Sequence, residues 1–284
     1  MAIESIGKFS VVGPLGTGAN STIMHIRRVE DGRDYALKLV TLDGNDDAKF
    51  LEQINHEYRV GQMFDHPSLL KVFTLELEKG LFGLGAVKKA KLLVEYVSGT
   101  TLDKAKLLRP VKLFRVLQKI ASGIAHMHSR GVLHADLKPG NIMLGRGTNA
   151  KVIDFGLAWI KGEPKDRVQG TPEYLAPETA KHKMVNERTD IYNFGATMYR
   201  LATFQLPPSH VPVDGLKMRE KDFKAALKPV LEIVPSTHPA FAKLIQECLA
   251  FDANKRPADM PAVEAALETL ADEAEASAEP GGLD

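Results

Sequence analysis

The apolar residues of the first hundred positions alternate with polar ones, a pattern that is typical of half-buried β-strands. Glycine-containing turns separate the first three runs, and Asp31-Gly32 between the second and third is a hairpin signal. The pattern therefore predicts a group of strands joined by turns in the N-terminal part of the chain. The predicted strands cover residues 9–15, 22–29, 33–40, 72–78 and 91–97.

Helical spacing of apolar residues interrupts these strands once and dominates after residue 110. Asp46 and Asp47 favour a helix start, and apolar residues recur at helical spacing from there until shortly before Asp65. Pro110 opens a longer helix with a buried apolar stripe, and Gly131 ends it. The second half of the chain is therefore predicted to be mainly helical. Further helical patterns cover residues 216–227, 239–250 and 259–272.

Composition and charge narrow the class of protein. The 284 residues are 44% hydrophobic and 26% charged, which is ordinary for a soluble protein. The formal net charge of +1 gives no electrostatic reason to expect binding to nucleic acid or to a membrane surface. The single Cys248 excludes an internal disulfide and fits a reducing compartment. No membrane-spanning run or signal-peptide apolar region is evident, so we expect a cytoplasmic protein.

The candidate chemistry lies between Val132 and Gly156. Short apolar runs at 132–133, 142–144 and 152–153 look like buried strands, and polar side chains follow them in loops. Loops at strand ends are where a rigid scaffold presents catalytic groups. Two carboxylates and an amide supply oxygen ligands of the kind that Mg²⁺ prefers. The polar residues are Asp136, Lys138, Asn141 and Asp154.

The pattern H-x-D-L-K-P-x-N at 134–141, followed by D-F-G at 154–156, resembles the catalytic and metal-binding loops of eukaryotic-type (Hanks-type) Ser/Thr protein kinases. The resemblance extends from Phe9 to Leu270. It implies an α+β fold of two lobes, one a small antiparallel sheet with one helix and the other larger and mainly helical. The implied divisions are an N-terminal lobe at 1–97, a C-terminal lobe at 98–272 and a flexible acidic tail at 273–284.

The resemblance also implies catalytic roles. Asp136 orients the acceptor hydroxyl of a protein substrate and accepts its proton, while Lys138 steadies the γ-phosphate of ATP. Thr171 is expected to bond near both residues and to line the acceptor site. Lys38 reaches the α- and β-phosphates and pairs with Glu57 of the predicted helix.

Metal and nucleotide contacts follow from the same resemblance. Asn141 and Asp154 would hold Mg²⁺, or Mn²⁺ in its place. Residues 16–21 resemble the phosphate-covering loop, although G-x-G alone is common in ordinary hairpin turns. A dinucleotide site would require a helix directly after this loop, and the strand-like run found there argues against one. Val94 would be the gatekeeper, with backbone groups of Glu95 and Val97 bonding the adenine edge. The implied nucleotide contacts are Leu15, Gly16, Gly18, Ser21, Ile23, Ala36, Lys38, Val94, Glu95, Val97 and Met143.

Two departures from the family pattern concern regulation. Ala135 occupies the position of the arginine that normally gathers an activation-segment phosphate. Between Asp154 and Glu178 the only hydroxyl residues are Thr171 and Tyr174, so we expect activity without phosphorylation of this segment. Gly61 replaces a bulky apolar residue one turn after Glu57; we expect the helix to be easily displaced, or the gap to be filled by a neighbour.

Two long-range contacts are expected as well. Glu178 should pair with Arg256, and Asp190 should hold the backbone of the catalytic loop. His126 and His128 point in divergent directions on a helix, so a metal site that includes them with His134 is disfavoured.

Other functions remain open. Ala135 and Gly61 give some weight to a pseudokinase, which binds nucleotide as a scaffold without useful turnover, but every expected metal and phosphate ligand is intact. A small-molecule phosphotransferase is disfavoured by the sequence GTPEYLAPE at 170–178, which resembles the peptide-docking loop of protein kinases. Protein substrates are the expected partners, and the sequence does not indicate an oligomeric state.

Overall fold

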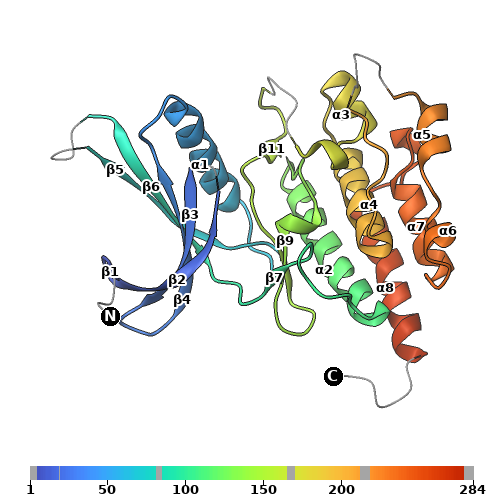
Figure 1. Ribbon diagram of the computed structural model, residues 1–284, viewed down its shortest axis with the longest axis horizontal. Coiled ribbons are helices and arrows are strands. Elements are labelled where there is room, and N and C mark those ends of the chain that lie inside the picture. Colours follow the sequence, from blue (N-terminus) through green and yellow to red (C-terminus); the bar gives the residue numbers. More distant parts are fainter. Residues whose placement is uncertain (1–4, 19, 81–84, 165–169, 212–217, 278–284) are drawn as a thin grey trace. The chain divides into compact units, whose positions relative to one another are not determined.

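The computed structural model describes residues 5–18, 20–80, 85–164, 170–211 and 218–277. The chain divides into two compact units (Figure 1). The first unit consists of Met1–Asp65, Leu69–Ser98 and Asp154–Gly156, and the second of His66–Ser68, Gly99–Ile153 and Leu157–Asp284.

The first unit is built on a six-stranded antiparallel sheet with the order β1-β2-β3-β4-β6-β5. Ile26 and Leu92 are fully buried, so one set of alternating positions forms the core as predicted. β6 begins four residues before the predicted Lys91, because its register with β4 continues through the exposed Lys89, where the apolar pattern is lost. The strands are β1 (Ser5–Ile6), β2 (Phe9–Thr17), β3 (Ser21–Arg28), β4 (Asp34–Thr41), β5 (Val72–Lys79) and β6 (Val87–Glu95).

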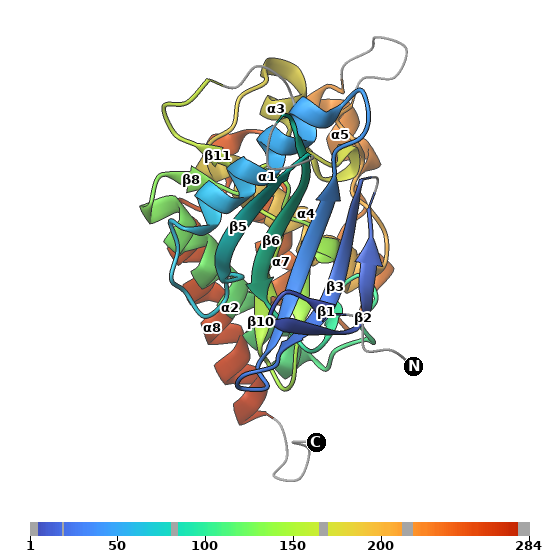
Figure 2. The same cartoon turned by 90° about the vertical axis from the view of Figure 1, so that its left-hand side faces the viewer.

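Helix α1 (Asp47–Gly61) completes the first unit and lies across β5 and β6 (Figure 2). Ile54 and Val60 on its buried face enter the core of the unit. Glu57 and Gly61 lie on the buried part of the helix too, which is unusual for a carboxylate and a glycine. The helix therefore presents both residues to the sheet.

The second unit is mainly helical. Its longest described helix, α2 (Pro110–Ser129), packs side by side with α8 (Met260–Ala276) (Figure 1). α4 (Glu187–Thr203) packs against α7 (Pro239–Cys248) at close range, since a Cβ at Gly195 would lie 2.7 Å from Cys248 Cβ. The shorter helices are α3 (Pro177–His182), α5 (Glu220–Ala226) and α6 (Val230–Ile233).

Two of the predicted helix bounds are wrong. The helix predicted at 216–227 is confined to α5, and α6 was not predicted. α8 continues to Ala276, beyond the predicted start of the flexible tail at 273. Arg115 of α2 forms ion pairs with Asp272 and Glu275, and these contacts stabilise the last turns of α8. Residues 278–284 lie outside the described residues.

Five short strands support the loops of the second unit. They form a three-stranded sheet, β10-β9-β7, and a two-stranded sheet, β11-β8. The strand predicted at 152–153 lies at 150–152, while β7 and β11 are two residues each and too short to show periodicity. The bounds are β7 (Thr100–Thr101), β8 (Val132–Leu133), β9 (Ile142–Leu144), β10 (Ala150–Val152) and β11 (Trp159–Ile160).

An antiparallel sheet with one helix and a second, mainly helical unit confirm the predicted α+β fold. Within the described part of the chain, the helices are either too short or too polar to span a bilayer.

Candidate active site

The first unit brings Lys38 of β4 and Glu57 of α1 together. Lys38 Nζ lies 2.6 Å from Glu57 Oε2, and Glu57 is only 5% exposed. Burial lowers the pKa of Lys38, but the carboxylates of Glu57 and Asp154 outweigh it and raise that pKa above its ordinary value. Burial raises the pKa of Glu57 and Asp154 adds to that rise, while the ammonium of Lys38 lowers the pKa without cancelling the effect of burial. One ammonium is therefore shared by two carboxylates.

The register of the sheet explains which residues accompany Lys38. Ala36 pairs with Val94 of β6, and Lys38 pairs with Ile23 of β3. Directly opposed residues of antiparallel strands point to the same side, as do residues two apart on one strand. Ile23, Ala36, Lys38 and Val94 therefore share one face of the sheet, and the structure brings these four predicted residues together.

The predicted phosphate loop is a tight turn between β2 and β3. The N–H of Gly18 donates to Ser21 O over 2.7 Å, and a Cβ at Gly18 would lie 2.9 Å from Ser21 Oγ, a contact that rotation of the serine side chain can relieve. Gly16 pairs with Ile23, while the side chain of Leu15 is 48% exposed. Ala19, the fourth residue of this loop, lies outside the described residues.

The predicted adenine contacts belong to different parts of the chain. The N–H of Glu95 donates to Lys71 O within the first unit. Val97 follows β6 in that unit. Met143 lies on β9 of the second unit, where it pairs with Thr101 of β7.

The second unit surrounds the carboxylate of Asp136 with donors. Oδ1 accepts hydrogen bonds from the N–H of Thr171 over 2.7 Å and from its hydroxyl over 2.8 Å. Oδ2 lies 3.0 Å from Lys138 Nζ and 3.2 Å from Asn141 Nδ2. Lys138 also donates to the hydroxyl of Thr171, so that hydroxyl links the ammonium to the carboxylate. The four predicted catalytic and metal-binding residues of this unit therefore meet at one carboxylate.

Asp190 of α4 holds the backbone that carries this cluster. Its fully buried carboxylate accepts hydrogen bonds from the N–H groups of His134 and Ala135, each over 2.8 Å. Ala135 has a φ of +62°, a left-handed conformation that is strained for an L-residue, and the bond to Asp190 offsets this strain. The contact predicted for Asp190 is thus present.

His128 is a further partner of Asp190 that the sequence did not predict. Its Nε2 lies 2.8 Å from Asp190 Oδ2. Burial alone would raise the pKa of Asp190, but hydrogen bonding to His128, with the nearby His134 and the N–H of Ala135, holds that pKa below its usual value. The two residues are 62 positions apart, so no local pattern could have linked them.

The predicted pair of Glu178 and Arg256 is present as a bidentate ion pair with distances of 2.8 and 2.9 Å. Thr189 donates to Glu178 as well, and Arg256 donates to the carbonyls of Ala250 and Arg188. The pair thereby ties the segment at 170–178 to the helices of the second unit. The part of the activation segment at 165–169 lies outside the described residues.

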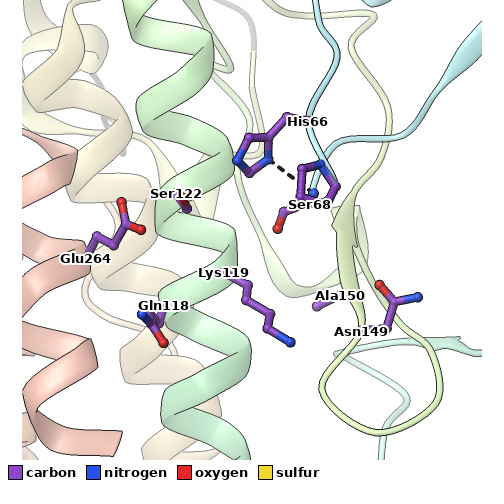
Figure 3. A pocket seen from close by; sticks show the side chains of 9 residues that line it. His66, Ser68, Gln118, Lys119, Ser122, Asn149, Ala150 and Glu264 are labelled. Carbon is purple, nitrogen blue, oxygen red and sulfur yellow. Dashed lines mark hydrogen bonds between the residues drawn. The ribbon is translucent and has the colours of Figure 1, made fainter.

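The second unit also has a pocket of about 260 Å³ that is lined in part by side chains of α2 (Figure 3). Figure 3 shows Ser122 on the helix, with residues 66–68 on one side and Glu264 of α8 on the other. None of the predicted site residues lines this pocket. The candidate site is therefore defined by the clusters at Lys38 and Asp136. The lining includes His66, Ser68, Gln118, Lys119, Ser122 and Glu264.

Comparison with known proteins decides the family. A family model described as the protein kinase domain matches residues 9–269. This chain belongs to the protein kinase family. The kinase domain is of the Ser/Thr type, because the relatives that it matches are named as Ser/Thr protein kinases.

Three relatives illustrate the range of similarity. The kinase domain is 31% identical over 268 residues to Serine/threonine-protein kinase pkn2 of Myxococcus xanthus, a match that covers 88% of this chain and 31% of the relative. It is 27% identical over 238 residues to Serine/threonine-protein kinase PrkC of Bacillus subtilis, covering 81% and 34%. It is 26% identical over 258 residues to cAMP-dependent protein kinase type 3 of Saccharomyces cerevisiae, covering 89% and 61%. The chain thus spans about a third of the length of the two bacterial relatives.

Proposed function

We propose that the protein transfers the γ-phosphate of ATP to Ser and Thr hydroxyls of protein substrates. The observation that carries this proposal is the donor-lined carboxylate of Asp136, bonded to Thr171 and adjacent to Lys138. A carboxylate held by fixed donors can orient a substrate hydroxyl and accept its proton. The ammonium of Lys138 supplies positive charge next to the reacting hydroxyl, where a transferring phosphoryl group is negative.

The other predicted residues act on the nucleotide. Lys38 is fixed by Glu57 and can position the α- and β-phosphates, while the face shared by Ile23, Ala36 and Val94 supports an adenine ring. Residues 1–97 would thereby bind the nucleotide, and residues 98–272 would carry catalysis and substrate docking. Most of the reduction of the barrier then comes from positioning and preorganised charges.

The donor set fits a divalent cation. Asn141 uses its Nδ2 to bond the carbonyl and the carboxylate of Asp136, so its Oδ1 remains to bind a metal. Asp154 accepts the N–H of Gly156 with one carboxylate oxygen, which leaves the other oxygen for the ion. Carboxylate and amide oxygens suit Mg²⁺, and also Mn²⁺. When bound, such an ion neutralises negative charge on the phosphates.

We further propose that activity does not require phosphorylation of the activation segment. The methyl group of Ala135 offers no positive charge to a phosphate, and its backbone N–H is already held by Asp190. Treatment of the purified protein with phosphatase should therefore leave the turnover number unchanged. Loss of turnover on dephosphorylation, restored by rephosphorylation, would contradict this part of the proposal.

The main test is transfer of radiolabelled phosphate from ATP to a generic protein substrate, followed by phosphoamino-acid analysis. We expect label on Ser and Thr with the wild-type protein and none above background with Lys38→Met. The alternative is a pseudokinase, which would bind Mg²⁺-ATP, as seen by a raised unfolding temperature, without transferring label. Label confined to tyrosine or to small molecules would refute the assigned substrate class.

A further inference from the structure

Helix α1 and strand β5 approach each other unusually closely at one point. A Cβ added at Gly61 would lie 2.4 Å from Cγ2 of Val72 and 2.7 Å from its Cβ, distances that real side chains essentially never adopt. Val72 is 5% exposed, and its β-branched side chain has little rotational freedom. The helix can therefore lie this close to the strand only because residue 61 has no side chain. Val72 fills the gap that Gly61 leaves, which is the second of the two predicted consequences, namely that a neighbour fills the gap.

The contact between Gly61 and Val72 lies on the same face of α1 as Glu57, the partner of Lys38. Residues 53, 57 and 61 are four positions apart and occupy one face of α1. Glu57 bonds Lys38, and one turn earlier Gln53 lies against Gly156, where a Cβ would be 2.9 Å from Gln53 Nε2. One helical face thus contacts the strand, the lysine and the segment that follows Asp154.

Two further contacts anchor the C-terminal end of α1. The side chain of Gln62 donates to the carbonyl of Val72 over 2.7 Å. Phe64, just beyond the helix, packs edge to face against Phe155 with ring centroids 5.6 Å apart. A displacement of this end of the helix would consequently be transmitted along its axis to Glu57 and Gln53.

We infer that Gly61 is a positioning residue: its close contact with Val72 sets the separation of α1 from β5 and so brings Glu57 within bonding distance of Lys38. The inference rests on the proposed function, because it assigns this contact a role in phosphate transfer. Gly61→Ala would insert a methyl group into Val72 and push the helix away from the strand. Val72→Gly in the same chain removes the Cβ and both γ-carbons, which are the three atoms that the new methyl group would meet.

A glycine that does not position the helix would give the opposite result on substitution. Alanine is a far better helix former than glycine. If Gly61 had no role in packing, Gly61→Ala would therefore stabilise α1 and leave activity unchanged. A control is Gly44→Ala, an exposed glycine just before the same helix whose added Cβ would meet nothing within 4 Å.

The experiment measures kcat, the KM for ATP and the unfolding temperature of wild type, Gly61→Ala, Val72→Gly, the double variant and Gly44→Ala. We expect Gly61→Ala to lower kcat about a hundredfold, as misplacement by about 1 Å does. The double variant should recover most of this loss, and Gly44→Ala should match wild type. Wild-type kcat in folded Gly61→Ala, or no recovery in the double variant, would overturn the inference.

A second comparison separates positioning from a general effect on folding. In a Glu57→Gln background the pair with Lys38 is already weakened, so adding Gly61→Ala should lower kcat by less than about threefold, because residues that act as a unit are not additive. An equal loss in both backgrounds would indicate a merely structural role.

Hydrogen exchange gives a readout that needs no activity. Gly61→Ala should speed amide exchange in α1, and Val72→Gly should restore protection in the double variant. If the wild-type protein transferred no phosphate, the proposed function would fail while this exchange pattern still decided whether the contact positions the helix. Unchanged exchange in Gly61→Ala would refute it.

Discussion

Thr171 supplies two of the hydrogen bonds on the Asp136 carboxylate, one from its backbone and one from its hydroxyl. Only the hydroxyl also accepts a hydrogen bond from Lys138. Because the backbone bond does not depend on the side chain, the contribution of the hydroxyl can be isolated by substitution. It links the proposed base to the cation beside it.

Thr171→Ala should lower kcat by about ten- to a hundredfold, since a hydrogen bond to a charged group is worth roughly 1.5–3 kcal/mol. The KM for ATP should change little, because the hydroxyl bonds Asp136 and Lys138, which are proposed to act on the acceptor hydroxyl and the γ-phosphate. Thr171→Ser keeps the hydroxyl and is expected to retain most of the activity. Steady-state kinetics of the three proteins test this, and equal kcat for the alanine variant and wild type would contradict it.

His210 is a buried histidine outside the proposed site. Its Nε2 lies 2.8 Å from the hydroxyl of Tyr192, and it packs against Phe223 and Phe251. Burial lowers its pKa from 6.5 to about 4; Arg256 and Lys181 lower it too, while Glu178 opposes them. The folded protein therefore keeps this ring neutral at pH values where the unfolded chain protonates it.

This difference makes folding sensitive to acid. As the pH falls from about 6.5 to about 4, the unfolded state binds a proton that the folded state does not, so the free energy of unfolding decreases. The loss approaches roughly 3 kcal/mol near pH 4. His210→Gln, which can still bond Tyr192 but cannot become charged, should flatten the pH dependence over this range.

Urea unfolding of wild type and His210→Gln at several pH values between 7 and 4 measures the effect. His182→Gln replaces an exposed histidine and should leave the wild-type slope in place. Identical slopes for His210→Gln and wild type would show that His210 does not cause the acid sensitivity.

At the scale of elements, the sequence predicted what local patterns encode. Alternation in β4 placed Ala36 and Lys38 on one face, and the register with β6 extends that face to Val94. The helix α1 was predicted because its apolar spacing is local. Elements of two residues, such as β7 and β11, carry no period and could not be predicted.

Contacts between distant elements were predicted only where the family resemblance implied them, as for Glu178 and Arg256. His128 and Asp190 meet across 62 positions, and Arg115 meets Asp272 across 157. The former involves the carboxylate that holds the catalytic loop and the latter joins α2 to α8, yet neither has a local signature. The closeness of Gly61 and Val72 is of the same kind: the sequence indicated a gap, but only packing reveals which residue fills it.

At the scale of the whole molecule, each unit carries its own cluster. The first holds Lys38, Glu57 and Asp154, and the second holds Asp136, Lys138, Asn141 and Thr171. The proposed function requires both clusters to act in one reaction. The motif residues in the sequence predicted the members of each cluster, because a family motif is a local pattern of residue types. Their bonding partners depend on the fold.

The measurement that tests this account most directly compares kcat for phosphate transfer by wild type and Asp136→Asn, with the rise in unfolding temperature on adding Mg²⁺-ATP as a separate readout of binding. Asparagine keeps the size of the side chain but is a far weaker base. The account predicts a loss of kcat of at least about a hundredfold with the nucleotide-induced rise retained. Wild-type turnover in Asp136→Asn would contradict it.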